Sequence, residues 1–185
     1  MSYLHNLLNS RNALFLLKIL HYAFLLAILK EHLSDALFIL LIGASLLLLM
    51  FAYSKTTQYA VQIELKDAVV FPCLLMGALL TYFLTAETTL GVVLSACIVG
   101  SVFALIPSKG FWKAVSAMIY CGVCIGMTGF FVAQGYFFIM LASLLGSIIW
   151  ILVKGQLNGF GGKLGTIAFG GVCAAALLTY LIESL

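Results

Sequence analysis

Residues 136–153 read YFFIMLASLLGSIIWILV, a stretch of 18 residues without one charged side chain. Gln134-Gly135 precedes it and Lys154 follows it. A bilayer core about 30 Å thick is crossed by about 20 apolar residues of helix, so this stretch predicts a transmembrane helix. The whole chain of 185 residues is 64% hydrophobic and 8% charged, with a mean hydropathy of +1.22. That composition leaves too little polar surface for a soluble globule and predicts an all-α integral membrane protein.

Cutting the rest of the chain at charged residues, glycines and prolines predicts a bundle of about seven transmembrane helices. Pro107 ends the fourth segment, and Pro72 lies in the first turns of the third, where a missing N–H costs least. The turn at Gln134-Gly135 is so short that the fifth and sixth segments could instead form one re-entrant element. The seven segments are Asn12–Leu29, Asp35–Tyr53, Asp67–Thr85, Leu90–Ile106, Lys113–Ala133, Tyr136–Val153 and Leu164–Ile182.

We expect one transmembrane domain with two parts that differ in composition. Residues 1–53 are rich in leucine and predict an N-terminal helix hairpin, whereas residues 67–182 are rich in small residues and predict a compact bundle. Small residues recur at helical spacing, as in Gly122 and Gly126 or Ala142 and Gly146, which lets helix backbones approach closely in lipid. This pattern also fits a homo-oligomer or a subunit of a larger membrane complex.

The basic residues predict the topology. Seven of the nine lie in alternate gaps between the apolar segments, while Lys30 falls on the other side and Lys18 lies within a segment. Because short cytoplasmic loops carry an excess of Lys and Arg, the N-terminus is expected in the cytoplasm and the C-terminus outside, in a bacterial inner membrane. No loop has a basic run typical of nucleic-acid binding, so nucleic acid is not an expected partner. The seven residues are Arg11, Lys55, Lys66, Lys109, Lys113, Lys154 and Lys163.

Few ionisable side chains fall inside the predicted helices. All six acids lie in loops or at segment ends, so no carboxylate pair is available for proton or cation coupling at mid-membrane. Lys18, His21 and Tyr22 share one stretch of the first helix, and Lys18 can extend to the cytoplasmic surface. His21 could bind haem or metal, relay a proton, or hydrogen-bond a neighbouring helix. We expect the hydrogen bond, because no second mid-membrane histidine completes a ligand pair.

Cys121-Gly122-Val123-Cys124 has the spacing of a redox or metal pair, but it lies inside an apolar segment without further ligands in sequence. We therefore expect two small buried residues there and predict no metal site and no cofactor.

The last predicted cytoplasmic loop contains glycines at 155, 159, 161 and 162 and runs directly into a helix. Glycines allow backbone N–H groups to turn toward an anion, and a helix N-terminus adds partial positive charge. Such a loop could hold a phosphate or a lipid headgroup, or it could be a tight turn anchored at the interface by its lysines. The candidate anion-binding residues are Gly161, Gly162, Lys163 and Thr166, with Lys109 and Lys113 closing the other side.

The segment Gly161-Gly162-Lys163-Leu164-Gly165-Thr166 resembles the Gly-Gly-Lys-Gly-x-Ala-Thr loop of the bacterial acyl-phosphate glycerol-3-phosphate acyltransferases. The pair Lys109-Gly110 is similar to an earlier Lys-Gly pair of that family. This resemblance implies a phosphate site on the cytoplasmic side and a role in phospholipid synthesis. A fainter resemblance links Gly159-Phe160-Gly161-Gly162 to the Gly-x-Gly-Asp motif of prepilin peptidases. The catalytic motifs of both families have no counterpart here, and we expect a protein that is not an enzyme.

Three classes of function remain. The first is a transporter, a channel or a membrane subunit for a small or phosphate-bearing solute; the second is a phospholipid-synthesis enzyme that uses the glycine loop. The third is a cofactor-binding subunit centred on His21. We expect the first, because it needs no catalytic residues and agrees with the small-residue stripes. A narrow polar path would then be lined by Ser95, Ser101, Ser116, Thr128, Ser143 and Ser147.

Overall fold

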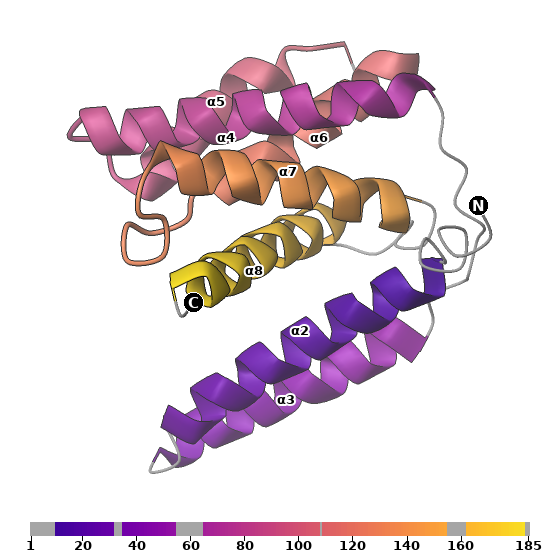
Figure 1. Cartoon of the computed structure of the whole chain (residues 1–185), viewed down its shortest axis with the longest axis vertical. Helices are drawn as coiled ribbons and strands as arrows, with labels where there is room; N and C mark the ends of the chain where they lie inside the picture. Colours follow the sequence, from indigo (N-terminus) through magenta and orange to yellow (C-terminus); the bar gives the residue numbers. More distant parts are fainter. Residues whose placement is uncertain (1–9, 32–34, 55–64, 108, 155–161, 184–185) are drawn as a thin grey trace. The chain divides into compact units, whose positions relative to one another are not determined.

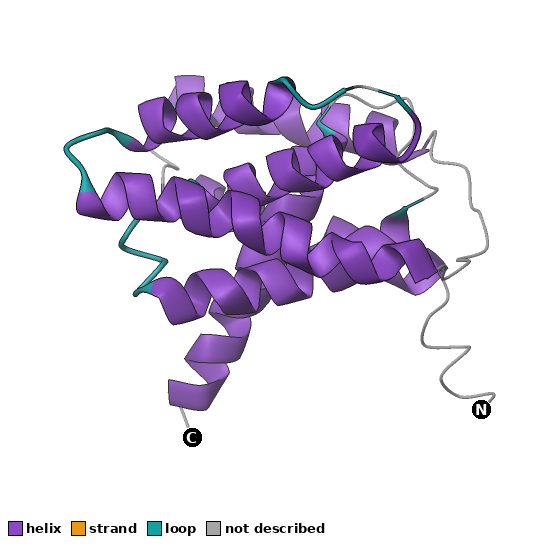
Figure 2. Cartoon of the chain, turned by 90° about the horizontal axis from the view of Figure 1, so that it is seen from above, coloured by secondary structure: helices purple, strands orange, loops and turns teal. Residues whose placement is uncertain are grey.

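The structure, a computed structural model, describes residues 10–31, 35–54, 65–107, 109–154 and 162–183. In these ranges every regular element is helical, which confirms the predicted all-α class (Figures 1 and 2). The elements are α2 (Ser10–Glu31), α3 (Ala36–Ser54), the 3-10 helix η1 (Leu65–Val69), α4 (Val70–Glu87), α5 (Val92–Ala104), α6 (Gly110–Gly126), α7 (Tyr136–Val153) and α8 (Lys163–Glu183).

Within the described residues, three helices are long and apolar enough to cross a membrane. They are Asp67–Glu87, Tyr136–Val153 and Lys163–Glu183. Shorter apolar helices cover Ala36–Phe51, Val92–Ala104 and Gly110–Gly126. These three helices are therefore compatible with a membrane location, while insertion of the chain and the number of spans stay predictions.

The chain divides into two compact units. One comprises Met1–Val61 with Leu152–Gly161 and contains the helix pair α2 and α3, which pack on each other. The other comprises Gln62–Ile151 with Gly162–Leu185 and contains η1 and the helices from α4 to α8. We call them the hairpin and the bundle.

The predicted end of the fifth span is wrong. We expected a helix to Ala133, but α6 ends at Gly126 and residues 127–135 form turns before α7 starts at Tyr136. The hydroxyl of Thr128 donates to the Ile125 carbonyl at 2.6 Å, which satisfies an acceptor at the helix end. Gly135 adopts a φ of 133°, a conformation that favours glycine. α6 and α7 are thus two separate helices, and whether each crosses the membrane or the two form one re-entrant element stays a prediction.

The two prolines act as expected. Pro72 is the third residue of α4, where the helix needs no donor from it, and α5 ends at Ala104, before Pro107. The chain after Ala104 closes with a turn in which the Ile106 N–H donates to the Phe103 carbonyl at 3.2 Å.

Helices α4 and α6 touch backbone to backbone through glycines. A Cβ atom added to Gly126 would lie 2.5 Å from the Ala78 carbonyl oxygen, and one added to Gly122 would overlap the Leu74 carbonyl. Gly77 of α4 approaches the α6 backbone in the same way. Because Leu74 pairs with Gly122 and Ala78 with Gly126, the two helices run in the same direction. Small residues permit this approach, as the stripe at 122 and 126 predicted.

A second glycine contact joins α7 and α8. A Cβ atom on Gly171 would lie 2.8 Å from both the Ala142 carbonyl oxygen and the Gly146 Cα. Figure 1 shows that α7 begins, and α8 ends, at the same end of the bundle, so these helices are antiparallel. α5 packs on both α4 and α6, and the Tyr120 hydroxyl donates to the Gly100 carbonyl at 3.0 Å.

The bundle core is apolar, and so is much of its outer surface. Among the largest fully buried side chains are those of Leu74, Ile119 and Ile125. Phe83 and Val93 are at least half exposed and are typical of the many large apolar side chains on the outside of the helices. A soluble monomer rarely exposes so much apolar surface, so this surface agrees with helices that face lipid.

Candidate functional site

Charged side chains divide the bundle into a basic and an acidic end. Lys109 precedes α6, Lys113 lies in its first turn, and Lys163 is the first residue of α8. Glu87 and Glu183 are the last residues of α4 and α8. α4, α6 and α8 begin at one end and finish at the other (Figure 1), so the lysines and these two glutamates lie at opposite ends. One acid, the buried Asp67 of η1, precedes α4 at the basic end.

The first turn of α8 contains the described part of the predicted anion loop. Gly162 has a φ of 86°, which favours glycine, and the Thr166 N–H donates to its carbonyl at 2.9 Å. The Lys163 side chain is half-buried, and Thr166 is half-buried one turn later. Gly161 lies outside the described residues. Backbone geometry here agrees with the predicted role of the glycine, and anion binding itself stays a prediction.

The other side of the predicted anion site consists of Lys109 and Lys113, and both side chains are exposed. Lys109 has extended backbone angles and caps the start of α6 without a side-chain hydrogen bond to it. Helices α6 and α8 pack on each other. Lys109 and Lys113 at the start of α6 and Lys163 at the start of α8 therefore belong to helices that are neighbours in the bundle. Closure of one site by Lys109, Lys113 and Lys163 together stays a prediction.

The cysteine pair was predicted only half correctly. Cys121 is fully buried, but Cys124 is exposed on the surface of α6. The Cys121 thiol donates to the Leu164 carbonyl at 3.4 Å, so it satisfies a backbone group in the first turn of α8. Residues three apart on a helix differ by about 60° in direction, which is enough to put one in the core and the other outside it. Within the described residues, no group of three His, Cys, Asp or Glu side chains could hold a metal ion.

In the hairpin, the structure adds Tyr53 to the predicted group at Lys18 and His21. The Lys18 Nζ lies 5.3 Å from the centroid of the Tyr53 ring, a cation–π contact. The His21 Nδ1 is 2.9 Å from the Leu17 carbonyl oxygen and 3.3 Å from the Tyr53 hydroxyl. Tyr22 is half-buried beside them in sequence. These contacts join α2 to α3 and show His21 in a helix-to-helix arrangement.

Sequence reasoning missed Tyr53 because it is the penultimate residue of α3 and belongs to no motif. An aromatic ring at the end of an apolar helix is typical of a membrane interface, and that signal alone was available. Its contact with His21 bridges 32 positions of sequence, and only the pairing of the two helices creates it.

The residues of the predicted serine path differ in exposure, and the path itself stays a prediction. Ser95, Ser143 and Ser147 are buried, but Ser101 is exposed. Ser143 donates to the Ile139 carbonyl and Ser147 to the Leu144 carbonyl, each on its own helix. Ser95 has a buried hydroxyl oxygen without a hydrogen-bond partner among the described residues. The small and polar positions of the bundle therefore serve packing first.

At the acidic end, tyrosines hold the loop of residues 127–135 against α4. The Tyr82 hydroxyl donates to the Ala133 carbonyl at 3.2 Å, and its ring lies edge-on to those of Phe130 and Tyr136 at 5.6 and 5.2 Å. The Tyr136 hydroxyl donates to the Glu87 carboxylate at 3.1 Å. The sequence contained no spacing signal for this cluster, because its members come from α4, the loop and α7.

Comparison with known proteins adds no relative: no family model, no curated protein and no solved structure matches this chain. The function must therefore be argued from its own residues.

Proposed function

We propose that this chain is a multi-pass inner-membrane protein of about seven spans that carries or holds a small, phosphate-bearing solute. It acts as a transporter or channel, or as the membrane subunit of a larger complex. The observation that carries the proposal is the separation of charge in the bundle, with Lys109, Lys113 and Lys163 at one end and Glu87 and Glu183 at the other.

This separation supports a defined orientation. Lysines near helix ends are retained on the cytoplasmic side during insertion, so the end where α6 and α8 begin is assigned to the cytoplasm. The end with Glu87 and Glu183 is then periplasmic or extracellular. Alternation along the chain from α4 to α2 puts the N-terminus in the cytoplasm.

The same separation supports an anionic ligand. Three helices, α4, α6 and α8, begin at the basic end, and helix N-termini carry partial positive charge that adds to the charge of nearby lysines. Lys163 is the best placed residue, because it is half-buried and opens α8 directly after the glycine at 162. A phosphate group that enters this end would meet positive charge from both α6 and α8.

The test uses the full chain in proteoliposomes, with uptake and binding of radiolabelled inorganic phosphate and of glycerol 3-phosphate as the readout. We expect Lys163→Ala to lower both by about tenfold, a change equivalent to about 1.4 kcal/mol. Lys30→Ala is the matched control, since Lys30 is an exposed lysine in the last turn of α2 in the hairpin. Unchanged binding in the Lys163 variant would overturn the anion site.

The same preparation separates transport from the enzymatic alternative, which uses the same residues. Formation of acylated glycerol 3-phosphate from an added acyl phosphate would make the chain an acyltransferase. Uptake without product would make it a transporter. Binding without uptake or product would favour a membrane subunit.

A further inference from the structure

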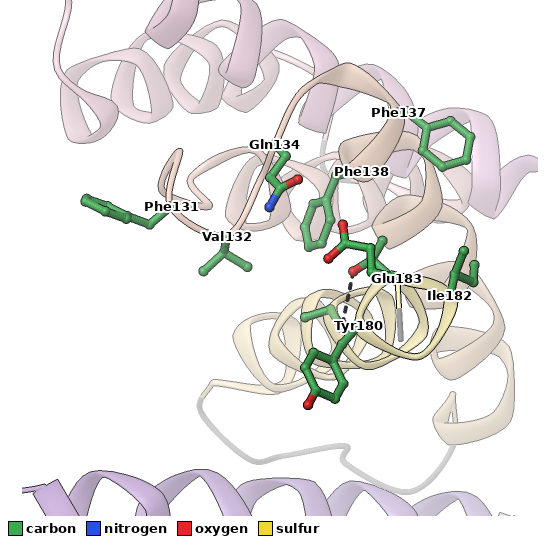
Figure 3. A pocket seen from close by; sticks show the side chains of 10 residues that line it. Phe131, Val132, Gln134, Phe137, Phe138, Tyr180, Ile182 and Glu183 are labelled. Carbon is green, nitrogen blue, oxygen red and sulfur yellow. Dashed lines mark hydrogen bonds between the residues drawn. The ribbon is translucent and has the colours of Figure 1, made fainter. Parts of the chain in front are cut away.

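A pocket of about 520 Å³ opens at the acidic end of the bundle (Figure 3). It lies between the loop of residues 127–135, the first turn of α7 and the last turns of α8. Its volume is within the range of about 300–1,000 Å³ that is usual for small-molecule sites. It lies at the opposite end of the bundle from the proposed phosphate site.

The lining combines aromatic rings with a single ionisable acid. Phe131, Phe137, Phe138 and Tyr180 contribute rings, and Glu183 is the one carboxylate among the lining side chains. Figure 3 shows the Glu183 carboxylate close to Phe138 at the α8 side of the pocket. The lining contains no lysine, arginine or histidine. Its only full charge is therefore negative.

The other polar groups offer hydrogen-bond acceptors. The Thr179 hydroxyl donates to the Ala175 and Ala176 carbonyls, both at 3.0 Å, so its proton is used and its oxygen can accept. The exposed Gln134 amide supplies one more carbonyl oxygen. A carboxylate and two acceptor oxygens beside the apolar side chain of Phe138 together suit an ammonium group on an apolar body, because the ammonium brings donors and positive charge.

The surroundings of the pocket indicate how a ligand arrives. The Phe131 side chain is fully exposed, and its neighbours Phe130 and Val132 are about half exposed, at 52% and 45%. Three consecutive exposed apolar side chains at the end of a membrane-type helix bundle are typical of a loop at the level of the lipid headgroups. A ligand that reaches the pocket from this level has an apolar body as well as a polar head.

We propose that this pocket binds the ammonium group of an amphipathic amine, with Glu183 as the counter-ion and Phe138 beside it. The amine has two possible sources, the headgroup of an aminophospholipid in the outer leaflet or a free organic amine. Both present a primary ammonium on an amphipathic molecule, joined directly to the apolar chain in the free amine and through a phosphodiester headgroup in the phospholipid.

The experiment uses the full chain in phosphatidylglycerol nanodiscs and a photoreactive octylamine with a diazirine in its chain. Mass spectrometry maps the labelled residues, and the matched octanol probe controls for apolar partitioning. We expect the amine to label residues of the pocket and the alcohol to label them about tenfold less, as loss of the charge pair with Glu183 implies. Equal labelling by both probes would overturn the proposal.

Two variants sharpen the result. Glu183→Gln keeps the shape of an exposed side chain and should reduce amine labelling to the level of the alcohol. Asp35→Asn, the same change at an exposed acid of the hairpin, should leave it unchanged. If the Glu183 variant labels like the native chain, the carboxylate has no role and the proposal fails.

The source of the amine is identified by changing the lipid of the nanodisc. Added phosphatidylethanolamine should displace the probe if an aminophospholipid is the natural occupant. Persistence of labelling in that lipid, with displacement by free octylamine, would identify a soluble amine as the ligand.

Discussion

Single glycines set the distance between α4 and α6. At Gly122 there is no room for a Cβ atom because the Leu74 carbonyl occupies its place, whereas at Gly43 of α3 nothing lies within 4 Å. The two positions are both inside helices, so they differ in their surroundings and not in local conformation.

Gly122→Ala should therefore destabilise the bundle by about 1–3 kcal/mol, the usual cost of forcing extra volume into a packed contact. Gly43→Ala should stabilise the hairpin slightly, by about 0.5–1 kcal/mol, because alanine is the better helix former. Reversible unfolding in mixed micelles, followed by circular dichroism, measures both. Equal stability of the two variants would show that α4 and α6 are not in backbone contact.

At the scale of elements, the loop of residues 127–135 is held both by its own hydrogen bonds and by side chains of other elements. Its internal bonds run from the Val132 and Ala133 N–H groups to the Gly129 carbonyl, both at 2.9 Å. The tertiary contact is the Tyr82 hydroxyl on the Ala133 carbonyl.

Tyr82→Phe should loosen this loop, because removal of a hydrogen bond costs about 0.5–1.5 kcal/mol. We expect the amides of Val132 and Ala133 to exchange with solvent about tenfold faster, measured by hydrogen–deuterium exchange. Tyr120→Phe is the control, since it removes a bond of similar length from Gly100 of α5 and should leave the loop unaffected. Equal acceleration in both variants would point to a general loss of packing.

In the hairpin, too, side chains of different elements contact one another. Its two helices meet at one polar group, where Tyr53 contacts both Lys18 and His21. No acid in α2 or α3 lies closer to Lys18 in sequence than Glu31, 13 positions away, and the Lys18 ammonium contacts the face of the Tyr53 ring.

At the scale of the whole molecule, the distribution of charge predicts the orientation in the membrane. In a cysteine-free background, Thr89→Cys lies in the exposed link between α4 and α5, and Lys109→Cys lies before α6. We expect a membrane-impermeant maleimide to label position 89 in intact spheroplasts and position 109 only after permeabilisation. The reverse pattern would invert the assignment of both ends.

Local composition was enough to predict where the helices lie. It does not determine where each helix ends, and the wrong prediction concerns such an end. Uninterrupted apolar residues from Tyr136 to Val153 were enough to predict α7 with both bounds correct. Hydropathy continues past Gly126 through Phe130 and Phe131, so nothing in it indicated where α6 ends. The end is set by Gly129, Gly135 and the contact with Tyr82, which depend on folding.

The candidate site residues also fall into two groups, those that the sequence predicted and those that only the structure revealed. Sequence alone predicted a helix from Leu164, directly after Gly162 and Lys163, and it identified Lys18 and His21 as ionisable residues within a span. It did not single out Tyr53 or Glu183, because the contact of Tyr53 with His21 and the pocket lining around Glu183 join residues that are distant along the chain.

By itself, the sequence determined that this protein is helical, suited to a membrane, and basic in alternate loops, because hydropathy and charge act locally and add along the chain. Only the tertiary structure decided that α4 and α6 run side by side in one direction, that Cys121 faces the core and Cys124 does not, and that a pocket ends at Glu183. These features depend on which helix faces meet, and that choice is made by packing between segments that are remote in sequence.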